Sequence, residues 1–74
     1  METKIIKIFK SATKVDNVSA QSLLREDLGF SSIRFMSFLE ELCESLKIDL
    51  FQLSQEDLQN SRTVGDIIEV FKKA

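Results

Sequence analysis

Two neighbouring serines are the side chains of this sequence best placed to take part in chemistry. Ser31 and Ser32 follow the segment Asp27-Leu-Gly-Phe30 and stand where a long amphipathic pattern begins. A serine just before a helix can cap it, because its oxygen accepts a hydrogen bond from a backbone N–H of the first turn. Ser31 suits that role, which would leave the Ser32 hydroxyl within reach of another protein. The partial positive charge of a helix N-terminus would stabilise an anionic group esterified at Ser32 by about 0.3–1 kcal/mol. On these residues alone, two serines that merely cap a helix are the simpler interpretation.

The composition excludes most other chemistry. The 74 residues include no histidine and a single cysteine, Cys43. Without imidazole there is no Ser/His/Asp or Cys/His catalytic arrangement and no histidine-bearing zinc site. One cysteine cannot form an internal disulfide or a multi-cysteine metal cluster, and it is typical of a reducing compartment. We therefore expect a non-catalytic protein without a metal site, in which Cys43 is a half-buried apolar side chain and not a reactive thiol.

The length predicts one domain over residues 1–74, which we expect to be a monomer. No apolar run approaches the roughly 20 residues that a membrane span needs. Residues 1–14 also lack the continuous apolar stretch of a signal peptide. These features predict a cytoplasmic protein without a membrane span.

The charges are distributed unevenly. Residues 1–14 have a net charge of +3, residues 15–61 a net charge of −6 and residues 62–74 a net charge of +1, within an overall charge of −2. The acidic middle section argues against nucleic acid as a partner, because phosphate binding needs a concentrated basic face. It favours partner proteins with basic surfaces.

Four helical patterns and no strand pattern run along the chain, so an all-α fold must position the serines. Apolar residues recur at helical spacing over residues 3–12, 32–46 and 64–71, and capping residues precede a short third helix that holds Leu58. Residues 22–29 predict a single turn that ends at Gly29, where the chain must reverse. The patterns predict a four-helix bundle with a short third helix, in which residues 14–21 form a polar loop and residues 47–53 an apolar connector.

The helix predicted over residues 32–46 has two different faces. One face is broad and apolar, and the opposite track includes Glu41 and Glu44. Ile33 and Met36 lie on a shoulder between the faces, where they could complete the edge of the core or form a docking surface beside the acidic track. A small helical interaction domain that binds a basic partner is therefore compatible with this sequence.

Two segments resemble the signature segments of acyl carrier proteins. That family has an acidic residue, Leu, Gly, two further residues, the modified Ser and then Leu. In this chain the pattern is met, with Ile in the last place, by Asp27, Leu28, Gly29, Ser32 and Ile33. The segment Thr63-Val-Gly-Asp66 is a second and independent match at the start of the last helix. Together with the chain length and the four helices, the resemblance covers residues 3–72.

The resemblance implies an acyl-carrier-like four-helix bundle that serves partner enzymes and is not itself an enzyme. It implies that a phosphopantetheinyl transferase uses coenzyme A and magnesium to attach 4′-phosphopantetheine to Ser32, and that the thiol of this arm holds acyl groups as thioesters. Acyl-transferring and chain-extending enzymes with basic docking patches would be the further partners, in fatty acid or polyketide-type biosynthesis. Partner docking would involve Asp27, Ile33, Met36, Glu40, Glu41 and Glu44. An acyl pocket between the helices would be lined by residues equally plausible as ordinary core: Leu28, Leu42, Leu46, Leu50, Leu58, Ile67 and Phe71.

Three positions depart from the family pattern. Ser31 stands where the family usually has Asp, and Arg34 and Ser37 stand where acidic residues often face basic partners. Electrostatic complementarity mainly sets encounter rate and partner choice, so these departures favour a specialised set of partners. The spacing from Gly29 selects Ser32 over Ser31 as the modified residue. An aminoacyl or peptidyl carrier, and the interaction domain without an arm, stay open as alternatives.

Overall fold

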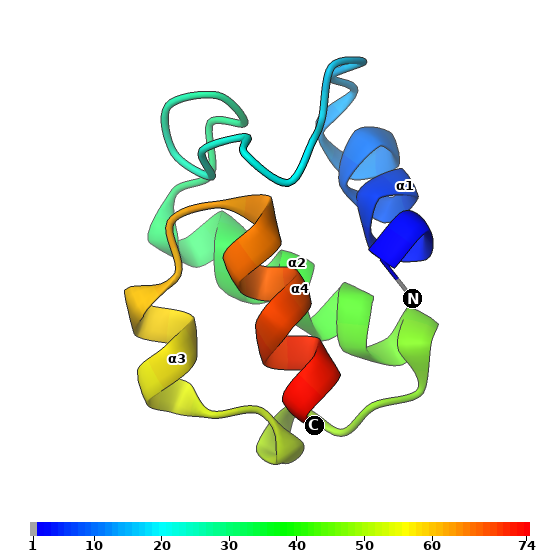
Figure 1. Ribbon diagram of the computed structural model, residues 1–74, viewed down its shortest axis with the longest axis vertical. Coiled ribbons are helices and arrows are strands. Elements are labelled where there is room, and N and C mark those ends of the chain that lie inside the picture. The colour runs from blue at the N-terminus through cyan, green and yellow to red at the C-terminus, as the bar shows by residue number, and fades with distance from the viewer. Residues whose placement is uncertain (1) are drawn as a thin grey trace.

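Four α-helices and one short 3₁₀ helix make up the computed structural model, which describes residues 2–74. The α-helices are α1 (Glu2–Thr13), α2 (Ser32–Leu46), α3 (Gln55–Asn60) and α4 (Val64–Lys73), and the 3₁₀ helix η1 spans Leu50–Gln52. Helix α1 packs against α2 and α4, η1 packs against α2, and α3 packs against α4. Figure 1 shows α1 and α3 on opposite sides of the pair formed by α2 and α4. The predicted all-α bundle is confirmed, and over residues 2–74 the chain forms no strand beyond one isolated bridge.

The helices begin at side chains that satisfy the first free backbone N–H groups. Ser31 precedes α2, and its hydroxyl accepts from the backbone N–H of Arg34. Ser54 does the same for α3. Thr63 and Asp66 form a reciprocal capping box at the start of α4. These caps are the ones that the sequence predicts, because Ser and Thr before an apolar run satisfy N–H groups that otherwise have no partner.

The connector over residues 47–53 contains the one helical element that the sequence patterns do not predict. Asp49 caps η1 by accepting from the backbone N–H of Phe51 at 3.0 Å, and the side chain of Gln52 accepts from the backbone N–H of Asp49 at 2.9 Å. This is a capping box with Gln in its third position. The signal was present in the sequence, but three residues are too few to show a helical apolar period.

The hydrophobic core lies between α1, α2 and α4. Its largest fully buried side chains include Phe9 of α1, Leu39 and Leu42 of α2, and Ile67 and Phe71 of α4. Three of the phenylalanines pack together in it with tilted rings, and the ring of Phe38 is centred 4.5 Å from that of Phe9 and 5.1 Å from that of Phe30. Helix α3 contributes no buried residue. The site described below therefore lies between a rigid three-helix core and one peripheral helix.

A short main-chain contact ties the loop before α2 to the turn before α4. Leu23 and Thr63 form an antiparallel bridge, in which the N–H of Leu24 donates to the carbonyl of Arg62 at 2.9 Å and the N–H of Val64 to the carbonyl of Ser22 at 3.0 Å. The N–H of Gly65 donates to the carbonyl of Ala20 at 2.8 Å. The loop that leads to Asp27 is thus hydrogen-bonded to the Thr63-Val-Gly-Asp66 segment, the second of the two segments that carry the acyl-carrier resemblance.

Candidate functional site

Ser32 is the first residue of α2, and its side chain is exposed. The capping duty falls to Ser31, whose hydroxyl lies 3.3 Å from the backbone nitrogen of Arg34. Among residues 2–74, no hydrogen bond engages the Ser32 hydroxyl. The two serines therefore play different parts, because one oxygen is used by the helix and the other is presented to solvent.

The segment just before Ser32 is held firmly to the core. Gly29 has a φ of +71°, which glycine adopts without strain, and its N–H donates to the carbonyl of Arg25 at 3.0 Å. The N–H of Phe30 then donates to the carbonyl of Leu24 at 3.0 Å, and the Phe30 ring enters the aromatic cluster. The chain thus passes from a buried aromatic residue to an exposed hydroxyl within two residues.

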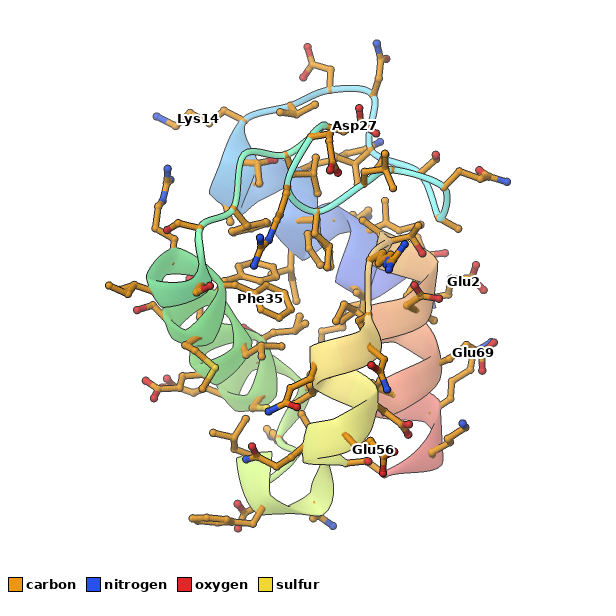
Figure 2. All side chains as sticks on the ribbon, turned by 90° about the vertical axis from the view of Figure 1, so that its left-hand side faces the viewer. Glu2, Lys14, Asp27, Phe35, Glu56 and Glu69 are labelled. Carbon is orange, nitrogen blue, oxygen red and sulfur yellow. The ribbon has the colours of Figure 1, made fainter. Side chains whose placement is uncertain are left out.

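A cavity of about 690 Å³ opens beside Ser32, between α2 and α3. Ser31, Ser32, Phe35, Met36 and Leu39 contribute to its α2 wall, and the opposite wall comes from α3. In Figure 2, where α2 and α3 both face the viewer, Phe35 points from α2 toward the space between them. The rest of its apolar lining is Leu23, Leu24, Phe30, Leu50 and Leu58. The candidate attachment residue therefore lines a cavity whose walls combine apolar and polar side chains.

The residues expected to line an acyl pocket do not lie together. Leu50 and Leu58 line the cavity beside Ser32. The other five, Leu28, Leu42, Leu46, Ile67 and Phe71, are outside its lining, and their place in an acyl pocket stays a prediction. Leu42, Ile67 and Phe71 are 0%, 0% and 1% exposed and belong to the packed core. Leu46 is half-buried against the core near the end of α2, and Leu28 lines a separate hollow under the loop over residues 15–22.

Helical periodicity explains why the expected pocket residues and the lining of this cavity differ. The apolar spacing marks which side of a helix is buried, but it does not separate side chains packed against other side chains from those beside empty space. Phe35, Met36 and Leu39, which the sequence analysis did not place in the pocket, line the cavity. Their signal was their distance from Ser32, since positions three, four and seven residues along a helix share its face.

The residues expected to form a docking surface are all exposed, but they differ in what they do. Ile33 is 82% exposed and Met36 is 48% exposed, so both belong to the surface and Met36 also reaches the cavity rim. Glu40, Glu41 and Glu44 are exposed along α2. Their exposure is compatible with contact to a basic partner.

Asp27 differs from the other docking candidates because its carboxylate already has a partner within the chain. Its Oδ2 atom accepts from the backbone N–H of Leu23 at 2.8 Å, which closes the turn over residues 23–27. The Asp27 side chain is exposed and points inward across the loop in Figure 2. It thus shapes the loop that carries Ser32, a task that the sequence analysis did not give it.

Cys43 is 5% exposed on α2 and makes no contribution to the cavity. Burial raises the pKa of its thiol, and the nearby carboxylates of Asp49 and Glu40 raise that pKa further. The thiolate is the nucleophilic form of cysteine, so this residue is poorly suited to nucleophilic attack at neutral pH.

Comparison with known proteins identifies the family. The model of the family described as "Phosphopantetheine attachment site" matches residues 3–71. The chain belongs to this family. It is also similar to a solved structure from Mycobacterium tuberculosis that is provisionally assigned as an acyl carrier protein, with 29% sequence identity and a TM-score of 0.78, over 96% of this chain and 93% of that one. A comparison with curated proteins found no match.

The chain is therefore a carrier domain of the acyl carrier protein family, and its cofactor is 4′-phosphopantetheine. The observed site fits that cofactor. A phosphodiester needs an accessible hydroxyl, which Ser32 offers without breaking any cap, and the cavity beside it has apolar walls. Across residues 2–74, no helix is both long and apolar enough to span a membrane, and no cluster of metal-ligating side chains is found.

Proposed function

We propose that this carrier domain holds acyl intermediates as thioesters on a 4′-phosphopantetheine arm attached to the oxygen of Ser32. The observation that carries this proposal is the division of roles between the two serines: Ser31 caps α2, whereas the exposed Ser32 hydroxyl lies on the rim of the cavity between α2 and α3. When bound, the arm supplies a thiol that forms thioesters. The chain itself supplies the attachment oxygen, an apolar cavity and a docking face.

The acyl groups of fatty acid or polyketide-type biosynthesis are the proposed cargo. Leu39, which is fully buried, and Leu50 and Leu58, which are half-buried, give the cavity apolar walls for a hydrocarbon chain. Removing such a chain from water is favourable by roughly 0.8 kcal/mol for each buried CH₂ group. The chemistry of loading and extension would belong to partner enzymes, among them a phosphopantetheinyl transferase.

The experiment that tests the attachment site is loading in vitro followed by mass spectrometry. The purified chain is incubated with coenzyme A, magnesium and a phosphopantetheinyl transferase of broad specificity. We expect the wild-type chain to gain one phosphopantetheinyl group, Ser32→Ala to gain none, and Ser31→Ala to be loaded still. Ser31→Ala also loses the cap of α2, which costs about 1 kcal/mol, so it serves as the control for a disturbed helix start.

Two outcomes of that experiment would contradict the proposal. Loading of Ser32→Ala to the wild-type extent would place the arm on another residue. A wild-type chain that is folded but never loaded would instead favour a helical interaction domain that binds its partner through Ile33, Met36 and the acidic residues of α2.

A further inference from the structure

Two arginines line the cavity and form no ion pair with any residue of 2–74. The charged residues that line it are Arg25, Glu26 and Arg62, so the lining carries a net positive charge although the whole chain is at −2. Both arginines are exposed, and neither takes part in an ion pair among residues 2–74, where the observed pairs are Lys72 with Glu2 and Lys73 with Asp57. Both guanidinium groups are therefore free to bind an anion brought to the cavity.

The main chain holds the two arginines at the same end of the cavity. The carbonyl of Arg62 accepts from the N–H of Leu24, the residue next to Arg25, at 2.9 Å. Asp66, whose charge also acts on Arg62, uses its carboxylate to accept from the backbone N–H groups of Arg62 and Thr63. The backbone at each arginine is thus fixed while the guanidinium stays available.

That end of the cavity is also the end at which Ser32 stands. Figure 2 shows the loop that contains Asp27 above the start of α2 and the end of α3, with η1 at the opposite, lower end. Among the lining residues, Arg25 belongs to this loop, Ser32 begins α2 and Arg62 follows the end of α3, whereas Leu50 belongs to η1. An anion attached to Ser32 would therefore meet the arginines, whereas the far end of a bound chain would meet apolar side chains.

We propose that Arg25 and Arg62 bind the phosphodiester that joins the arm to Ser32, and so hold the first part of the arm over the cavity. This inference rests on the proposed attachment at Ser32. The phosphodiester carries one negative charge, and a planar guanidinium binds phosphate oxygens through two parallel hydrogen bonds. The covalent link to Ser32 keeps the phosphate close to both side chains, so binding needs no intermolecular encounter.

The test compares the unloaded and the loaded chain in three proteins: the wild type, the double variant Arg25→Gln/Arg62→Gln and the control Lys7→Gln/Lys10→Gln. The control removes the same charge from exposed positions of α1, which does not line the cavity. Each protein is loaded to completion and checked by mass. The readouts are the thermal midpoint of unfolding by circular dichroism and the ³¹P resonance of the phosphodiester.

We expect loading to raise the midpoint of the wild type and of the control at low salt, and the rise to shrink at high salt because ions screen exposed charges. In the double variant this rise should be lost and the ³¹P resonance should move toward that of a free phosphodiester. The conservative variant Arg25→Lys/Arg62→Lys should restore part of the rise, since it keeps the charge but loses the planar geometry.

The inference is overturned if the double variant keeps the wild-type rise and the wild-type ³¹P resonance. It is also overturned if loading does not raise the thermal midpoint of the wild type, or if salt does not change that rise. These results do not depend on whether the variants fold. If every protein loads completely and one of these results is found, the proposed attachment at Ser32 stands and only the role of the arginines is contradicted. Failure to load the wild type would overturn both proposals together.

Discussion

Ser31 and Ser32 show how adjacent residues of the same type acquire different roles from their position. The first lies outside the helix with extended backbone angles, φ −87° and ψ 169°, which aims its oxygen at the N–H groups of the first turn. The second is already part of the helix, and its hydroxyl makes no hydrogen bond within residues 2–74. Backbone conformation thus decides which of the two hydroxyls is used by the helix and which stays available.

Gly65 is a second residue whose role depends on its immediate surroundings. A Cβ atom at this position would lie 3.0 Å from the carbonyl oxygen of Ala20 and 3.4 Å from its Cβ. The same carbonyl accepts the N–H of Gly65 at 2.8 Å. The glycine of the Thr63-Val-Gly-Asp66 segment thus permits the close approach of α4 to the loop, although glycine normally weakens a helix.

We predict that Gly65→Ala lowers the free energy of unfolding by about 1 kcal/mol, because crowding against a backbone atom outweighs the gain in helix propensity. Urea unfolding followed by circular dichroism measures this, since the chain has no tryptophan or tyrosine. Gly29→Ala is the comparison variant. Nothing lies within 4 Å of a Cβ atom added at this position, so backbone strain at positive φ is the only destabilising effect expected there. A more stable Gly65→Ala would show that the loop yields to the added methyl group.

At the scale of elements, the start of α4 depends on a charged side chain. The carboxylate of Asp66 accepts from the backbone N–H of Arg62 at 2.9 Å and from that of Thr63 at 3.2 Å. The hydrogen bond from Arg62 is the main cause that lowers the pKa of Asp66 below its usual value of 3.8. Burial, the next largest cause, raises this pKa, and the bonds from Thr63 and the charge of Arg62 lower it further. The ionised form thus fastens α4 to the bridge with Leu23.

This pKa shift predicts that the free energy of unfolding falls at acidic pH. Because the native pKa is lowered, Asp66 contributes stability above its unfolded pKa near 3.8, and this contribution is lost as the pH falls through the native pKa. Asp66→Asn should therefore lower the free energy of unfolding near neutral pH by about 0.5–1 kcal/mol. The effect is modest because water screens the exposed carboxylate of Asp66. The difference from wild type should shrink as the pH falls below about 4. Unfolding curves at several pH values measure it, and a difference that is constant with pH would contradict the electrostatic account.

Most of the helices could be predicted from the sequence, and particular residues show why the cavity could not. Capping residues and apolar spacing predicted α2 with its observed bounds, because both signals are local. The cavity could not be predicted, since it depends on how far α3 stands from α2. Leu42 and Leu58 look alike in the sequence, but one is packed in the core and the other borders empty space. Arg62 likewise becomes a neighbour of Arg25 only through the bridge between the two loops.

At the scale of the whole molecule, charge and exposed apolar surface meet on α2. Ile33 and Met36 are exposed near the start of this helix, and Glu41 and Glu44 are exposed farther along it. The basic residues of α1, Lys4, Lys7 and Lys10, are exposed on another helix. Such separation of charge orients a protein during encounter with a partner of opposite charge.

We predict that Glu41→Lys/Glu44→Lys slows loading by the phosphopantetheinyl transferase by roughly ten-fold or more at low salt, because it reverses the charge of the exposed face of the helix that begins at Ser32. The helix content should stay unchanged, since both side chains are exposed and make no hydrogen bond or ion pair within residues 2–74. Initial rates of loading at several salt concentrations, with circular dichroism as the control, measure the effect. Equal rates for variant and wild type would remove the acidic residues of α2 from partner recognition.

Helix α3 packs less extensively than the other α-helices of this molecule. It contributes no buried side chain and, among the helices, packs against α4 alone. Displacing it would remove less apolar contact than displacing any other α-helix, because the stabilisation from burial scales with the apolar area removed from water. Under the proposed function we therefore expect cargoes of different length to be accommodated by a shift of α3, while the phenylalanine cluster keeps its place.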